Sequence, residues 1–174
     1  HLRNYITFPN VTETKFAIRG ELIISKTNWK LIKDLGSNPR NVVAGAIHSK
    51  ILNKTLLNNI EFLAYDILFP EMKIEDSFNY FTRNNIKSAY YKLLEFDDIN
   101  LQTLSKHLES RRNDSDYQVD GIVIYNNKQH KIVNGKNPKY AFAFKSILTH
   151  EQAEVIVTNV EWNVSMHKYM KPII

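Results

Sequence analysis

The chain has 174 residues, no cysteine and a formal net charge of +5. This length is sufficient for one domain with a packed core, and the lack of cysteine excludes disulfide bonds, thiolate metal ligands and cysteine nucleophiles. No apolar run approaches the length of a membrane span, so we expect no membrane partner. The basic balance would suit a polyanion, although a lysine-rich solvated surface explains it more simply.

The first half of the chain predicts two strands and two short helices. A run rich in β-forming residues predicts a strand over residues 15–25. Apolar spacing predicts a helix over 27–35, which Gly-Ser-Asn-Pro at 36–39 ends, and a second helix over 41–50. The continuous apolar run at 60–68 has the length of a buried strand.

The second half continues the alternation of helices and strands. Helices are predicted at 75–83 and after the capping residues Asp97 or Asp98, where Leu101, Leu104 and Leu108 share one face. Strands are predicted at 88–96, 117–125, 140–146 and 152–164. Because the elements interleave without a steady βαβ rhythm, we expect an α+β fold with largely antiparallel sheets.

Two segments of the first half contain candidate functional residues. A glycine inside a strand, as in Arg19-Gly20-Glu21, weakens the strand unless something approaches its backbone closely. Taken alone, the flanking charges are more simply an exposed ion pair. Arg40 follows Pro39 at a loop–helix junction, where a guanidinium can bind a phosphate through two hydrogen bonds. A helix-entry turn with a surface arginine is an equally good reading.

Two further segments lie in the second half. Asp120 precedes the apolar strand residues 122–124, and burying a lone carboxylate is costly unless Mg²⁺ or a cation compensates it. A turn aspartate before a strand is the simpler alternative. Lys145 ends the aromatic run 140–145 and would suit a phosphate contact. Alone, it is better explained as a lysine whose stem follows the strand end.

Taken in order, these segments resemble the NAD-dependent DNA ligases. Each motif is weak alone, but five in register, with the N-P-R-N run among them, are specific. FAIRGELI resembles motif III, NPRNVVAGA the family's N-P-R-N-A-A-A-G stretch, EFLAYD motif IIIa, DGIVI motif IV and PKYAFAFK motif V; they occupy residues 16–23, 38–46, 61–66, 120–124 and 138–145. Residues 150–172 resemble the first strand of the family's oligonucleotide-binding barrel.

The resemblance implies a nucleotidyltransferase fold, as in DNA ligases and mRNA capping enzymes. It places the distal part of an adenylation domain at residues 1–148 and the start of an OB-fold domain at 149–174. It further implies NAD and Mg²⁺ as cofactors, nicked duplex DNA as partner, and an intracellular location at sites of DNA replication or repair.

The resemblance also assigns residues to the nucleotide. In the family a lysine attacks the α-phosphate of NAD⁺, and the AMP passes to a 5′-phosphate at a nick before the 3′-hydroxyl displaces it. Glu21 would contact the AMP ribose, and Lys145 would neutralise the α-phosphate. Tyr65 would stack on adenine, and Val123 would cover its other face.

Other matching residues are implied to contact metal, phosphate or DNA. Asp120 would hold or orient the metal and, with Lys145 and Glu21, would support catalysis. Arg40 and Arg112 match family arginines that contact phosphates or nicked DNA, and Arg112 would belong to the nucleotide site as well.

The chain departs from the family pattern in three ways. It contains no K-x-D-G run, the motif that carries the nucleophilic lysine, so another segment or subunit would have to supply it. Tyr125 stands where the family has a second phosphate-contacting lysine, and Met166 replaces an arginine of the barrel. We therefore expect part of a nick-sealing ligase, or alternatively an inactive relative with a nucleic-acid-binding or assembly role. A relative acting on RNA ends or caps is a third reading, which the N-P-R-N run disfavours.

Overall fold

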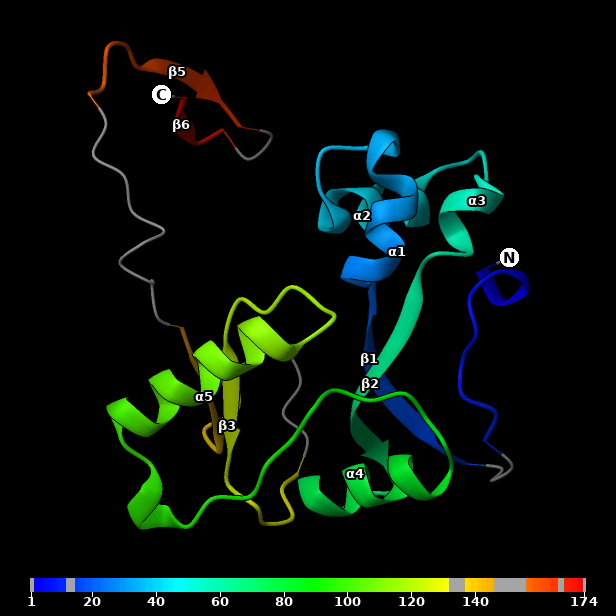
Figure 1. Cartoon of the computed structure of the whole chain (residues 1–174), viewed down its shortest axis with the longest axis vertical. Coiled ribbons are helices and arrows are strands. Elements are labelled where there is room, and N and C mark those ends of the chain that lie inside the picture. The colour runs from blue at the N-terminus through cyan, green and yellow to red at the C-terminus, as the bar shows by residue number, and fades with distance from the viewer. Residues whose placement is uncertain (1, 12–14, 132–136, 146–155, 166–167, 174) are drawn as a thin grey trace.

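Small antiparallel sheets with helices packed around them make up the chain (Figure 1). The computed structural model describes residues 2–11, 15–131, 137–145, 156–165 and 168–173. In these parts every paired strand of a sheet is antiparallel, which confirms the expected α+β class with antiparallel sheets. The chain opens with a short 3-10 helix, η1 (Leu2–Asn4).

The first sheet pairs β1 (Ala17–Ile23) with β2 (Glu61–Phe69). A Cβ added to Gly20 would collide with the ring of Phe62 and would lie 2.6 Å from the Leu63 carbonyl oxygen. The close approach expected at this glycine is therefore confirmed, and the neighbouring strand makes it. The register shifts between Arg19 and Gly20, so that Tyr65 forms a bulge on β2.

A helical layer covers one end of this sheet. It contains α1 (Lys26–Ile32), the 3-10 helix η2 (Lys33–Leu35), α2 (Pro39–His48) and α3 (Lys54–Leu57). The predicted helices are confirmed, except that the second begins earlier than expected because Pro39 is a favoured first helical residue. Their buried side chains form one core with the N-terminal segment: Ile6, Ile24, Ile32, Val42, Val43, Leu56, Leu57 and Ile60.

Helix α4 (Ile74–Arg83) packs on β2 at the other end of the sheet (Figure 1). Phe78 and Phe81 bury their rings against Ala64 and Ile67 of β2. The strand predicted at 88–96 was wrong. Only Ser88 forms a bridge, parallel to Ala64, and the following residues extend along α4, where the apolar Tyr91 stacks on Phe78 instead of joining a sheet.

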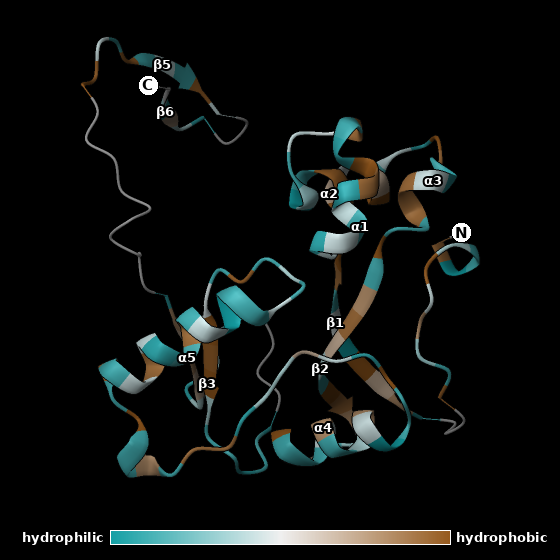
Figure 2. Cartoon of the chain, in the orientation of Figure 1, coloured by the Kyte–Doolittle hydropathy of each residue, from teal (hydrophilic) through white to brown (hydrophobic). Residues whose placement is uncertain are grey.

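The second sheet pairs β3 (Ile122–Tyr125) with β4 (Ala141–Phe144), and α5 (Leu101–Asp114) lies beside it. The 3-10 helix η3 (Phe96–Asp98) precedes α5, whose N-cap is Asn100 instead of the predicted aspartates. Figure 2 shows hydrophobic colour along β3 and an alternation of hydrophilic and hydrophobic residues along α5. Residues 117–121, predicted as strand, form a loop whose polar groups bind side chains of other elements.

A third sheet pairs β5 (Glu161–Val164) with β6 (Met170–Ile173). The strand predicted at 152–164 is confirmed only for its last four residues. Residues 156–160 are irregular, and 152–155 lie outside the described residues, as does Met166. Within the described parts of the chain, no helix has the length and apolar character needed to cross a membrane.

Candidate functional site

The face of the first sheet that points away from the core carries four polar residues. Arg19 and Glu21 are exposed on β1, where alternate residues Ile18 and Leu22 pack into the core. Arg19 lies 3.8 Å from a carboxylate oxygen of Asp66, its partner on β2, so the ion pair forms across strands and not with Glu21.

Tyr65 lies among these charges because of the bulge in β2. Burial raises the pKa of the Tyr65 hydroxyl, and the charges of Arg19, Glu21 and Asp66 also act on it. Burial likewise raises the pKa of Asp66, although the nearby Arg19 guanidinium partly offsets this. The structure therefore brings Glu21 and Tyr65, two predicted site residues, into one cluster with Arg19 and Asp66.

One face of the second sheet carries the other predicted nucleotide contacts. Val123 pairs with Ala143 and Tyr125 with Ala141, so these side chains share a face. A Cβ on Gly121 would lie 2.7 Å from the Phe144 carbonyl oxygen and 2.8 Å from Cγ of Lys145. The glycine thus lets the start of β3 approach the residue that ends β4. Val123 is 59% exposed on this face.

Tyr125 connects the two sheets electrostatically. Burial raises the pKa of its hydroxyl, and Asp66, Tyr140 and Tyr65 raise it further, while Arg19 lowers it. Tyr125 therefore lies within electrostatic range of the cluster on the first sheet, and it lines one small cavity together with Asp66. A phenol is uncharged at neutral pH even at its ordinary pKa, and it can donate one hydrogen bond.

Arg40 and Asp120 form an ion pair with 3.0 Å between guanidinium nitrogen and carboxylate oxygen. Pro39 is the first residue of α2, and the Asn38 side chain accepts a hydrogen bond from the Asn41 amide, which fixes the helix start. Arg40 therefore projects from a defined helix entry. Both predicted roles of this arginine remain open, because its side chain is 76% exposed and retains access to solvent.

The loop between α5 and β3 holds Arg112 close to Asp120. Arg112 donates from Nε to the Val119 carbonyl at 3.2 Å and from Nη2 to the Asp120 carbonyl at 3.4 Å. The Lys26 ammonium donates to the Arg112 and Ser115 carbonyls at the end of α5. Arg112, Arg40 and Asp120, three predicted site residues, are thus neighbours in space.

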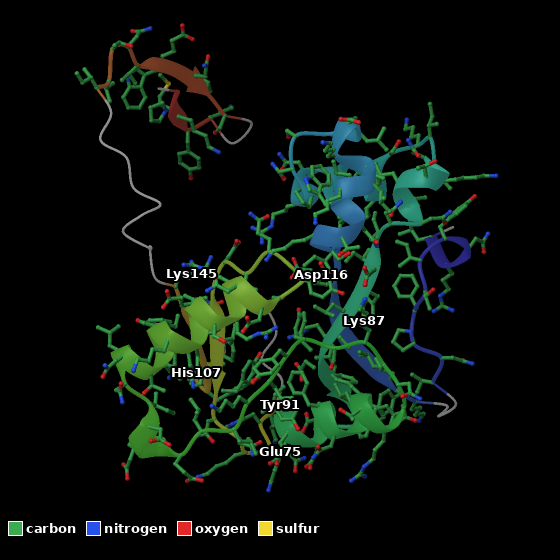
Figure 3. The ribbon with its side chains drawn as sticks, in the orientation of Figure 1. Glu75, Lys87, Tyr91, His107, Asp116 and Lys145 are labelled. Carbon is green, nitrogen blue, oxygen red and sulfur yellow. The ribbon has the colours of Figure 1, made fainter. Side chains whose placement is uncertain are left out.

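The turn after β3 contacts the start of α4, the helix that packs on β2 of the first sheet. The side chains of Asn127 and Glu75 hydrogen bond at 2.7 Å, and Asn127 also accepts from the Glu75 amide. Gln129 donates to the Glu71 carbonyl. Figure 3 shows Glu75 beside this turn. A small cavity of about 30 Å³ lies here between Asp66 and Tyr125.

A second polar cluster, which the sequence did not indicate, lies outside the predicted site. Glu61 accepts a hydrogen bond from the Tyr117 hydroxyl at 2.8 Å and pairs with the Lys87 ammonium. It also accepts from the side-chain amide of Asn28. Burial alone would raise the pKa of Glu61, but the hydrogen bonds from Lys87 and Tyr117 outweigh it and lower the pKa. The same contacts raise the pKa of Lys87.

The donor set fits a metal only in part. Among the described residues, no group of three or more histidine, aspartate or glutamate side chains could hold an ion. Mg²⁺, however, is commonly bound by one carboxylate together with substrate phosphates and water. Asp120 fits that arrangement, with its Arg40 partner displaced or shared by the phosphate.

Comparison with known proteins agrees with the order of these elements. Residues 4–147 match the profile of the NAD-dependent DNA ligase adenylation domain. A protein named DNA ligase in Acanthamoeba polyphaga mimivirus is 31% identical over 90% of the chain, and a candidate DNA ligase of Invertebrate iridescent virus 3 is 33% identical over 92%. A protein named DNA ligase in the bacterium Natranaerobius thermophilus is 26% identical over 90%. The chain spans only 24%, 22% and 26% of these three proteins.

Proposed function

Because the chain belongs to the family of NAD-dependent DNA ligase adenylation domains, we propose that its two facing sheets bind the AMP part of NAD⁺ for the sealing of nicked duplex DNA. The observation that carries this proposal is a small cavity that Asp66 of the first sheet and Tyr125 of the second line together, beside the cluster of Arg19, Glu21 and Tyr65. An aromatic ring, a carboxylate and an uncharged phenol in one cleft suit a base and a ribose.

We assign the contacts as follows. Tyr65 and Val123 hold the adenine between them, and Glu21 accepts from the ribose hydroxyls. Lys145 and Arg40 neutralise the phosphate, while Asp120 orients Mg²⁺, which supplies charge neutralisation when bound. Arg112 acts on the phosphate or the DNA backbone. Residues 149–174 would begin an OB-fold domain that helps to hold the duplex.

The covalent step requires a lysine that these 174 residues do not offer in a K-x-D-G run. The test is the intact mass of the native polypeptide, in which another segment or subunit would supply that lysine, before and after incubation with NAD⁺ and Mg²⁺. Calorimetric titration of AMP measures the cleft itself. Gain of one AMP by the native polypeptide, and AMP binding that Tyr65→Ala and Glu21→Gln weaken, are the expected results. Failure of the wild-type protein to bind AMP or NAD⁺ would contradict the assigned cleft.

A second candidate function rests on Tyr125. A phenol supplies no positive charge where the family has a lysine, and a close charge at an effective dielectric constant of about 20 has a gross value of several kcal/mol. A relative that binds nicked DNA without transferring AMP would tolerate this change. Binding of nicked duplex with no AMP adduct at any NAD⁺ concentration would favour this second function over the first.

A further inference from the structure

Among the described residues, the two sheets share no hydrogen-bonded strands. Polar contacts outside the sheets therefore help to set the spacing between Tyr65 on β2 and Tyr125 on β3. Three such contacts are Asn127 with Glu75, Tyr117 with Glu61 and Arg40 with Asp120. A further set joins the start of α1 to the loop that follows α5, and it lies next to the strands that carry the predicted nucleotide contacts.

The contacts at α1 run in both directions. Asp116 accepts hydrogen bonds through one carboxylate oxygen from the backbone N–H of Thr27 at 3.1 Å and from the Thr27 hydroxyl at 2.9 Å. The Asp116 carbonyl accepts from the backbone N–H of Lys26. In return, the Lys26 ammonium donates to the carbonyls of Arg112 and Ser115 at 3.1 and 2.8 Å.

These groups satisfy the polar ends of two helices. A carboxylate at the N-terminus of α1 and an ammonium at the C-terminus of α5 each complement a helix dipole and otherwise unpaired backbone groups. Ser25, the N-cap of α1, accepts a hydrogen bond through its hydroxyl oxygen from the backbone N–H of Asn28 at 3.1 Å. Lys26, the first residue of α1, thus binds the end of α5, and Asp116, in the loop after α5, binds the start of α1, which fixes the relative position of the two helix ends.

The position of this exchange links it to the cleft. Lys26 follows shortly after the end of β1, the strand of Arg19 and Glu21. Asp116 begins the loop that leads to Asp120 and β3. Figure 3 shows Asp116 at the point of this loop nearest to α1. A shift of either helix end therefore moves one strand of the cleft relative to the other.

We propose that Lys26, Thr27 and Asp116 are positioning residues that set the spacing of the two sheets and thereby the affinity of the cleft for AMP. This inference rests on the proposed function for its ligand, but its geometric part does not. The three residues touch neither the predicted ligand nor a predicted site side chain. Lys26 does contact Arg112, a predicted site residue, but only at its backbone carbonyl.

The test compares two lost contacts at helix N-termini. Asp116→Ala removes the carboxylate that accepts from Thr27 at the start of α1, where Ser25 remains the N-cap. Asn53→Ala removes the N-cap of α3, away from the cleft, where the Asn53 side chain accepts from the backbone N–H of Leu56 at 3.0 Å. Each variant is expected to unfold at a lower urea concentration than the wild-type protein. Only Asp116→Ala, and likewise Thr27→Val, should weaken AMP binding by about tenfold or more, since small misplacements are costly in such sites. Thr27→Ser keeps the hydroxyl and should restore the affinity.

Hydrogen exchange separates this inference from the proposed function, because it needs no nucleotide. Amides of residues 119–125 should exchange faster in Asp116→Ala than in the wild-type protein, and not in Asn53→Ala. Equal exchange in wild-type protein and Asp116→Ala would overturn the inference, as would equal losses of AMP affinity in Asp116→Ala and Asn53→Ala. If the wild-type protein binds no AMP, the proposed function fails. The exchange rates still decide whether Lys26, Thr27 and Asp116 position β3.

Discussion

The guanidinium of Arg40 lies 3.0 Å from a carboxylate oxygen of Asp120, although the two residues begin different elements of the fold. Arg40 enters α2, and Asp120 precedes β3. Two residues that the sequence singled out for separate reasons therefore meet at one end of the cleft. Each side chain neutralises the charge of the other. A phosphate would therefore compete with Asp120 for Arg40, and Mg²⁺ would compete with Arg40 for Asp120.

The ion pair is expected to contribute little to stability. A double-mutant cycle of Arg40→Ala and Asp120→Asn, measured by urea unfolding, should give a coupling energy of about 0.5 kcal/mol, because both side chains are well exposed. The coupling should decrease further in high salt. A coupling several times larger that persists in salt would show that the pair is a structural element and not a contact that a ligand can replace.

Replacing Tyr125 by lysine should strengthen AMP binding by about tenfold, or about 1.4 kcal/mol. The ammonium would supply a positive charge that attracts the phosphate, which the phenol lacks. Partial burial of the ammonium would offset part of this gross attraction. Tyr125→Phe is the control, because it removes the hydroxyl without adding charge. Titration calorimetry at two salt concentrations measures the effect; equal affinities of Tyr125→Lys and Tyr125→Phe would contradict it.

Alanine should destabilise the protein at Gly20 and stabilise it at Gly45. A Cβ at Gly20 would meet the Phe62 ring and the Leu63 carbonyl, so Gly20→Ala is expected to cost about 1–3 kcal/mol. Gly45 lies inside α2, and a Cβ there would have no atom within 4 Å. Gly45→Ala should therefore gain about 1 kcal/mol from helix propensity. Thermal unfolding of both variants provides the measurement, and shifts of the same sign would refute the contact at Gly20.

Glu61 should make the protein sensitive to acid. Its pKa in the fold is lowered from an ordinary value of 4.5, so its contribution to stability is fully present above pH 4.5. That contribution is lost as the pH falls through the lowered pKa. Glu61→Gln should lower the free energy of unfolding by about 1 kcal/mol at neutral pH. Below pH 4.5 it should lose less stability than the wild-type protein does. Urea unfolding across this range, with Tyr117→Phe as a milder variant, decides whether Glu61 is the group that titrates.

Much of the fold followed from local patterns in the sequence. The strand at β2 and the helices α1, α2, α4 and α5 were predicted because apolar spacing and turn residues act within a few residues. The strand at 88–96 was predicted wrongly because its aromatic residues pack on α4, a tertiary contact that no local pattern shows. Residues 117–121 likewise form a loop, because Glu61 binds Tyr117 and Arg112 binds the carbonyls of Val119 and Asp120.

The candidate site was only partly predictable. The resemblance marked Glu21, Tyr65 and Asp120, and the structure places the first two in one cluster. It gave no reason to expect that Arg19 pairs with Asp66, since that contact depends on the register of two distant strands. Asp116 and Glu61 were missed because their importance arises from partners far away in the chain. Asp116 lies just before a predicted strand and Glu61 within one. An acidic side chain at either place has many possible partners, and only the fold selects one.

The division of the chain between the two sheets has a consequence for how it could be built. Strands β1 and β2 lie in the first half and β3 and β4 in the second, and residues 92–95 between them form neither helix nor strand. A chain cut at this segment would leave both sheets intact, because each fragment would contain both strands of its own sheet. Two fragments expressed separately could then reassemble through the Asp116–Thr27, Tyr117–Glu61 and Asn127–Glu75 contacts. Recovery of the folded state from the two fragments would therefore measure how strongly these contacts hold the two sheets together.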